Sequence, residues 1–172
     1  KKIKGINTDW VGYLKSIKNL NINKTKNIVI LGYGGASQAI VYGLVSRGFK
    51  NFSVFNRSKK LVKFGAIKTY TKKYTLIDNY LDKADIIINT TPTNPLNKKQ
   101  IRRVGKNVVV SDIVYRPRNT IFLNSFQENK KIYGISMLIE QAIPCFQAWF
   151  GFRPTADNLL IKKLNNKTKW QK

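Results

Sequence analysis

Two kinds of apolar run alternate along the middle of the chain. Short runs rich in β-branched residues, typical of buried strands, lie at residues 27–32, 51–56, 84–90, 107–114 and, more weakly, 131–135. Between them, stretches with helical spacing of apolar positions lie at 36–47, 59–65, 76–82, 97–104 and 120–128. Continuous apolar strands that alternate with helices predict a parallel sheet covered on both faces. We therefore expect an α/β fold with a doubly wound, Rossmann-type parallel sheet.

Both ends of the chain depart from this alternation. Within residues 1–20, a helix is predicted from residue 10 onward, after a polar cluster. Within residues 136–172, a long apolar helix is predicted over 136–151. A last helix is predicted over 154–164, with a proline in its first turn. We expect these extra terminal helices to brace a neighbouring domain, and the rest of residues 1–172 to form one cofactor-binding domain.

A glycine-rich turn, "GYGGAS", joins the first predicted strand to the following helix. This is the context that a dinucleotide-binding fingerprint requires, although such turns also occur for steric reasons alone. A first glycine permits the tight turn, and a second lets the backbone approach a pyrophosphate at the helix N-terminus. The candidate cofactor-binding residues in this turn are Gly32, Gly34, Gly35, Ala36 and Ser37.

The second predicted strand ends in a polar loop that contains no acid. An NAD site normally places a carboxylate here to accept a hydrogen bond from the ribose 2′-OH, and that carboxylate would repel a 2′-phosphate. A guanidinium, a hydroxyl and ammonium groups suit the phosphate instead. This loop therefore favours NADP over NAD as the cofactor. Its candidate cofactor-binding residues are Asn56, Arg57, Ser58, Lys59 and Lys60. The alternative is a solvated basic turn in a lysine-rich protein.

The overall charge changes this picture little. The chain of 172 residues has 32 basic and eight acidic side chains, a net charge of +24. The lysines are scattered rather than gathered in one stripe, and they accompany abundant Asn, Ile and Tyr, as A/T-rich codons would supply. Nucleic acid is therefore not expected as a main partner, whereas attraction for anionic metabolites is expected. No apolar run approaches the roughly 20 residues of a membrane span, so no membrane partner is expected.

Histidine is absent and Cys145 is the only cysteine. A single cysteine excludes an internal disulfide and suits the reducing cytoplasm. The absence of histidine excludes Ser-His-Asp chemistry and imidazole-based zinc sites, and we expect no metal centre. Proton transfer would have to be carried out by Asp, Glu, Lys or Tyr.

Six motifs, in order, resemble the C-terminal, NADP-binding half of shikimate dehydrogenases, a family that also includes quinate dehydrogenases. They are "GINTDWVGYL" (5–14), "GYGGAS" (32–37), "NRSKK" (56–60), "INTTP" (88–92), "SDIVYRPRNTIFL" (111–123) and "GISMLIEQAIPCFQAWFG" (134–151). The resemblance implies an NADP-dependent oxidoreductase that interconverts 3-dehydroshikimate and shikimate in aromatic amino-acid biosynthesis, on the path to chorismate.

The resemblance also implies roles for single residues in substrate handling. Asp9 matches the carboxylate that lies beside the substrate in the interdomain cleft, paired with a lysine of the N-terminal substrate domain. Asp9 would therefore be both a catalytic and a substrate-binding residue. From the sequence alone, helix N-capping explains Asp9 about as well. Tyr115 and Gln141 match two further substrate-binding residues.

The same resemblance adds four residues at the nicotinamide end of the cofactor site. Gly134 and Met137 match residues that border the nicotinamide, and Ile113 matches one whose backbone touches that ring. Thr90 lies in a loop that borders the cofactor.

The chain also departs from the family pattern. Tyr133 replaces a common Asp, Gln38 replaces a frequent Arg, and Leu61 occupies a place where a basic residue often clamps the 2′-phosphate, which leaves Lys59 or Lys60 to substitute. The chain starts with Lys-Lys rather than Met, so we expect it to be a piece of a longer protein.

The family's substrate domain, which would precede the Asn-Thr-Asp cluster, does not lie within this sequence. We expect that domain in cis or in trans, and the chain alone to bind cofactor with little turnover. A quinate or other hydroxy-acid dehydrogenase, and a non-enzymatic module that binds nucleotides or polyanions, are the alternatives. The sequence does not indicate the oligomeric state.

Overall fold

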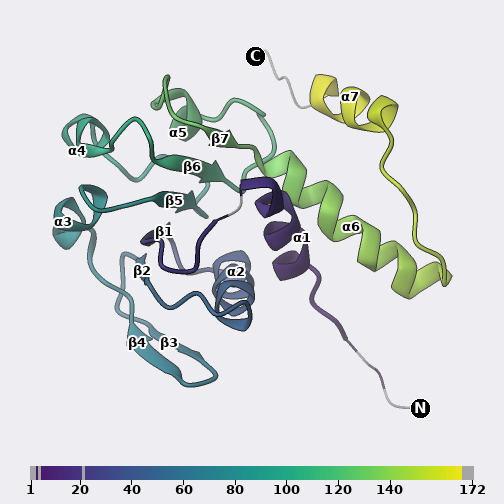
Figure 1. Ribbon diagram of the computed structural model, residues 1–172, viewed down its shortest axis with the longest axis horizontal. Helices are drawn as coiled ribbons and strands as arrows, with labels where there is room; N and C mark the ends of the chain where they lie inside the picture. The colour runs from purple at the N-terminus through teal and green to yellow at the C-terminus, as the bar shows by residue number, and fades with distance from the viewer. Residues whose placement is uncertain (1–2, 4, 21, 168–172) are drawn as a thin grey trace.

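A five-stranded parallel sheet forms the centre of the computed structural model, which describes residues 3, 5–20 and 22–167. The strand order is β2-β1-β5-β6-β7 (Figure 1). The strands are β1 (Ile28–Leu31), β2 (Phe52–Phe55), β5 (Ile86–Asn89), β6 (Val109–Asp112) and β7 (Lys131–Ile132). In the central register, Ile28 of β1 lies opposite Phe52 on one side and Ile86 on the other. All five predicted strands are therefore confirmed.

Helices cover the sheet and extend beyond it (Figure 1). They are α1 (Asp9–Ser16), η1 (Lys18–Leu20), α2 (Gly35–Ser46), η2 (Tyr74–Leu76), α3 (Asp78–Leu81), α4 (Lys98–Arg103), α5 (Ile121–Asn124), α6 (Gly134–Phe150) and α7 (Asn158–Lys167). The long helix α6 ends at Gly151, whose φ of 80° gives the left-handed C-cap that glycine favours. The last helix starts later than predicted, because the Asp157 carboxylate accepts a hydrogen bond from Leu160 N at 2.6 Å and caps it there.

The predicted helix over 59–65 is wrong, because this stretch forms an antiparallel hairpin. Its strands are β3 (Leu61–Phe64) and β4 (Ile67–Tyr70). Val62 is fully buried between the exposed Leu61 and Lys63, which is the alternation of a strand. Gly65, with φ of 55°, supplies the left-handed residue of the two-residue turn.

Two hydrophobic clusters, one on each face of the sheet, confirm the doubly wound arrangement. Ile28 and Ile30 of β1 belong to the cluster that contains Leu44 of α2. Val29 and Leu31, which point the opposite way, belong to the cluster that contains Phe122 of α5. Burial on both faces explains why β1 and most of β5 are continuous apolar runs. Within the described residues, no helix is both long enough and apolar enough to cross a membrane.

The helix α1 packs between α2 and α6, and glycines permit both contacts (Figure 1). A Cβ atom on Gly12 would lie 2.6 Å from Gln141 Cβ and 2.7 Å from the carbonyl oxygen of Met137 in α6. The contact with α2 is looser, because a Cβ atom on Gly43 would lie 3.2 Å from Trp10 Cβ. The first turns of α1 are thereby fixed against the first half of α6.

Candidate functional site

The glycine turn between β1 and α2 is held in place by hydrogen bonds from three directions. Gly32, with φ of 93°, donates its N–H to the Phe55 carbonyl at 2.7 Å. The buried Ser37 hydroxyl donates to the Gly32 carbonyl at 2.9 Å, and the Thr90 hydroxyl donates to the Leu31 carbonyl at 2.7 Å. The Ser37 side chain therefore stabilises the turn from within, and the Thr90 side chain lies next to Gly32.

The next two glycines of the turn face open space. A Cβ atom on Gly34 or Gly35 would meet nothing within 4 Å. Gly34 also has φ of −91° and ψ of −169°, a conformation that any residue adopts. Neither packing nor the backbone conformation of Gly34 requires glycine here, and the two glycines leave open space at the N-terminus of α2. Ala36, the second residue of α2, is half-buried behind them.

The basic loop 56–60 lies directly after β2, at the same edge of the sheet as the glycine turn. The Asn56 amide donates to the Ser58 carbonyl at 3.1 Å, so this side chain braces the loop from within. Arg57, Ser58, Lys59 and Lys60 are exposed, and no carboxylate belongs to the loop. These five residues therefore present positive charge beside an open turn.

Tyr74 is a neighbour of this site that the sequence did not single out. Its ring packs against Phe55 of β2, with ring centroids 6.2 Å apart. Burial raises the pKa of Tyr74, while a hydrogen bond from the Gly32 backbone and the positive charge of Arg57 act in the opposite direction. Tyr74 thus lies between the glycine turn and the basic loop.

A buried polar network fixes the ends of β5 and β6. The Asp112 carboxylate accepts hydrogen bonds from the Thr120 hydroxyl at 2.6 Å, from Val114 N at 3.0 Å and from the Asn89 amide at 3.3 Å. Burial raises the pKa of Asp112, and these hydrogen bonds act against that rise. Asp112 was missed as a candidate, although an acid at the end of an apolar strand was a usable signal. Its role is to hold the segment that carries Ile113.

Three of the four predicted nicotinamide-side residues lie at the start of α6, whereas Thr90 lies beside Gly32. The N–H of Ile113 donates to the Asn89 carbonyl at 3.1 Å. Gly134 is buried against the backbone of Ile113, and a Cβ atom there would collide with the Ile113 carbonyl oxygen. Met137 follows one turn later and is also buried. Tyr115, two residues beyond Ile113, is 45% exposed.

Asp9 is the first residue of α1, and its carboxylate is not used as a helix cap. The N-cap residue is Thr8, and the Asp9 N–H donates to Asn7 Oδ1 at 3.0 Å. Within the described part of the chain, the half-buried Asp9 carboxylate makes no hydrogen bond or ion pair. The capping interpretation of Asp9 is therefore wrong.

Thr8 links the start of α1 to Gln141 of α6. The buried Thr8 hydroxyl donates to Gln141 Oε1 at 3.1 Å and also contacts Cys145 Sγ at 3.0 Å. Thr8 was missed as a positioning residue because its partners are more than 130 positions away in the sequence. The structure thus brings Asp9 and Gln141 to one end of the α1–α6 contact.

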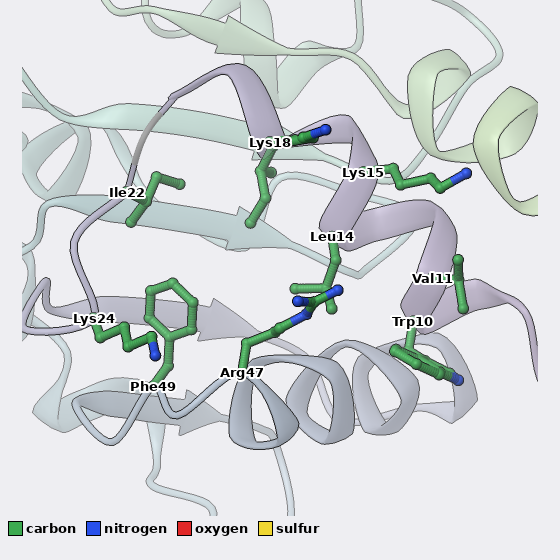
Figure 2. Close-up of a pocket in the computed structure, with 10 residues that line it drawn as sticks. Trp10, Val11, Leu14, Lys15, Lys18, Ile22, Lys24, Arg47 and Phe49 are labelled. Carbon is green, nitrogen blue, oxygen red and sulfur yellow. The ribbon is translucent and has the colours of Figure 1, made fainter.

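A separate cleft of about 450 Å³ lies between α1, the segment after it and the C-terminal end of α2 (Figure 2). Lys15, Lys18, Lys24 and Arg47 surround apolar side chains that include Phe49. None of the predicted site residues lines this cleft, which lies at the opposite end of α2 from the glycine turn. Because lysines occur throughout the chain, these four cations do not by themselves indicate a ligand.

Comparison with known proteins places this site in context. A family model described as shikimate/quinate 5-dehydrogenase matches residues 15–136. A shikimate dehydrogenase (NADP(+)) of Aquifex aeolicus is 36% identical over 155 residues, which cover 87% of this chain and 57% of the relative. The solved shikimate dehydrogenase of Aquifex aeolicus aligns with a TM-score of 0.70 and 30% identity, over 94% of this chain and 60% of that one.

A second solved structure carries ligands. The shikimate 5-dehydrogenase of Thermus thermophilus, in complex with NADP(H) and shikimate, aligns with a TM-score of 0.70 and 25% identity, over 95% of this chain and 63% of that one. The chain spans 57% to 65% of the length of the first six curated relatives that it matches.

Proposed function

This chain belongs to the shikimate/quinate 5-dehydrogenase family, and we propose on that premise that it is the NADP-binding part of a shikimate dehydrogenase. The observation that carries the proposal is the acid-free basic loop 56–60 beside a glycine turn whose Gly34 and Gly35 face open space. Curated relatives that share 33% to 36% identity are named as NADP(+) enzymes.

The described residues fit NADP at both ends of a dinucleotide. The N–H groups at the start of α2, from Gly35 onward, would bind the pyrophosphate, while Arg57 with Lys59 or Lys60 would bind the 2′-phosphate. The bound cofactor supplies the hydride. The side of the site that faces the nicotinamide would be formed by Thr90, Ile113, Gly134 and Met137.

Asp9 would take part in the proton transfer that accompanies hydride transfer. Its carboxylate is free of protein partners in the described chain and lies at the start of a helix, where negative charge is stabilised. With a lysine of the substrate domain, it would take the proton of the substrate hydroxyl during oxidation and return it during reduction. Because Gln141 Oε1 accepts from Thr8, the Gln141 amide NH₂ is the end that would face the substrate, together with the exposed Tyr115.

The terminal helices would brace the substrate domain, in cis or in trans. Figure 1 shows α6 running away from the sheet, after which the chain turns back, and α7 shares an apolar cleft with α6. Trp149, Phe150 and Phe152, where α6 ends, are 60% to 76% exposed, and Leu159 of α7 is 60% exposed. Such a set of exposed large apolar side chains is typical of a surface that another domain covers.

We propose the cytoplasm as the compartment, because Cys145 is a free thiol.

Cofactor preference tests the proposal directly. The chain is expected to bind NADPH more tightly than NADH in a fluorescence titration, and Arg57→Ala should remove most of that preference. Loss of one charge-assisted contact to phosphate corresponds to about 1.5–3 kcal/mol, or roughly tenfold to a hundredfold in the dissociation constant. Affinity for NADH should stay the same, since NADH has no 2′-phosphate. Equal affinity for both cofactors would contradict the NADP assignment.

Turnover by the chain alone is expected to be absent or very low. The catalytic lysine of the family belongs to the substrate domain, so this chain would hold only half of the acid-base pair. NADPH formation from NADP⁺ should therefore stay at background with either shikimate or quinate, and should appear when a substrate domain is supplied. Robust shikimate oxidation by the 172-residue chain would contradict this expectation. Faster quinate than shikimate turnover in the combined protein would favour the quinate alternative.

A further inference from the structure

The hairpin β3–β4 returns the chain to the edge of the main sheet, directly beside the basic loop. Lys72 forms a single parallel bridge with Phe55, the last residue of β2. Lys72 N donates to the Val54 carbonyl at 2.8 Å, and Asn56 N donates to the Lys72 carbonyl at 3.0 Å. Figure 1 shows the hairpin beside β2 and α2. The segment 71–72 is therefore hydrogen-bonded alongside the end of β2, where the loop 56–60 begins.

Thr71 makes three hydrogen bonds to that loop and is only 6% exposed. Its hydroxyl accepts from Lys60 N at 2.9 Å and donates to the Ser58 carbonyl at 3.0 Å. Its own N–H donates to the Lys60 carbonyl at 2.9 Å. One side chain thus fixes both the middle and the end of the loop, through a hydroxyl that is donor and acceptor at once.

This internal anchoring leaves the basic side chains on the outside. Arg57 and Lys59 are exposed, and Lys59 Nζ lies 4.6 Å from the centroid of the Tyr70 ring, a cation–π contact. A guanidinium binds phosphate through donors in a fixed fork, so its strength depends on where the backbone places it. The backbone of 57–59 is placed by the hydrogen bonds at Ser58 and Lys60.

We propose that Thr71 determines cofactor specificity as a positioning residue, by holding the loop 56–60 in the shape that presents its cations to a 2′-phosphate. The inference rests on the proposed NADP function and deepens it. Valine has the shape of threonine without the hydroxyl, so Thr71→Val would leave the Lys60 N–H and the Ser58 carbonyl without this partner. The loop would then loosen while the sheet and the glycine turn stay in place.

The test compares NADPH and NADH affinity in matched variants. Thr71→Val is expected to weaken NADPH binding about tenfold and to change NADH binding by less than about twofold. Thr71→Ser, a separate single variant that keeps the hydroxyl, should bind NADPH with the same preference as the parent chain. Thr69→Val makes the same change at an exposed threonine of the same hairpin and should behave as the parent chain.

The outcomes separate this inference from the proposed function. A parent chain that does not prefer NADPH contradicts both. A second result is that the parent chain prefers NADPH, and that this preference is lost in Arg57→Ala but kept in Thr71→Val. That result overturns the role of Thr71 alone. Should Thr71→Val fail to fold, amide hydrogen exchange of the parent chain decides. The Lys60 N–H should exchange at least about tenfold more slowly than an unprotected amide, and unprotected exchange would overturn the inference.

Discussion

Replacing Gly34 by alanine is expected to weaken NADPH and NADH binding to a similar extent while leaving the fold intact. The added methyl group would meet no protein atom within 4 Å, and alanine readily adopts the backbone angles of Gly34. Alanine at this N-cap position should lower the free energy of unfolding by at most about 1 kcal/mol, a Tm change within roughly 4 °C. The methyl group would instead occupy the space where the pyrophosphate approaches the N-terminus of α2.

The expected loss of affinity is on the order of a hundredfold, or about 2.7 kcal/mol, for both cofactors in a fluorescence titration. This pattern differs from that of Arg57→Ala and Thr71→Val, which should affect NADPH alone. Gly105→Ala is the matched control, because a Cβ atom there would meet only Val108 Cγ2, at 3.8 Å, and Gly105 lies outside the glycine turn. Unchanged affinity in Gly34→Ala would mean that the turn joins β1 to α2 without binding a dinucleotide.

The centre of the sheet could be predicted from the sequence, because burial on both faces requires unbroken apolar runs in β1 and in most of β5. Ile28 to Leu31 and Ile86 to Ile88 are all buried, and no polar residue interrupts them. The hairpin could not be distinguished in this way. Its strands are four residues long and bury chiefly Val62, so the alternation covered too few positions to separate period 2 from period 3.6.

The candidate site was predictable where consecutive residues carry the chemistry, as in the glycine turn and the loop 56–60. It was not predictable where contacts join distant segments. Thr71 reaches Ser58 across 13 positions, and Thr8 reaches Gln141 across 133. Both threonines look like ordinary polar residues until the fold brings their partners to them. The capping interpretation of Asp9 failed for a related reason, since only the structure shows that Asn7 and Thr8 occupy the positions before the helix.

Gly12→Ala is expected to cause a clear loss of stability, because α1 and α6 meet closely at this glycine. The new Cβ would lie 2.6 Å from Gln141 Cβ, 2.7 Å from Met137 O and 2.8 Å from Gln141 N. Two of these atoms belong to the α6 backbone, which cannot rotate away, so the two helices would have to separate. Overpacking of this kind costs about 1–3 kcal/mol, and alanine's better helix propensity returns at most about 1 kcal/mol.

Because the nearest atoms include α6 backbone, we expect a net loss of about 2 kcal/mol, and thermal unfolding followed by circular dichroism should show a Tm lower by roughly 4–8 °C, at about 2–4 °C per kcal/mol for a chain of this size. Gly43→Ala in α2 is the control, because it brings the same gain in helix propensity with a milder contact, 3.2 Å to Trp10 Cβ and 3.4 Å to the Leu14 side chain. Its Tm should stay close to that of the parent chain. Equal stability of the two variants would show that α1 and α6 can separate freely. In that case the Thr8–Gln141 hydrogen bond could not hold Asp9 at a fixed place, and the proposed role of Asp9 would lose its structural basis.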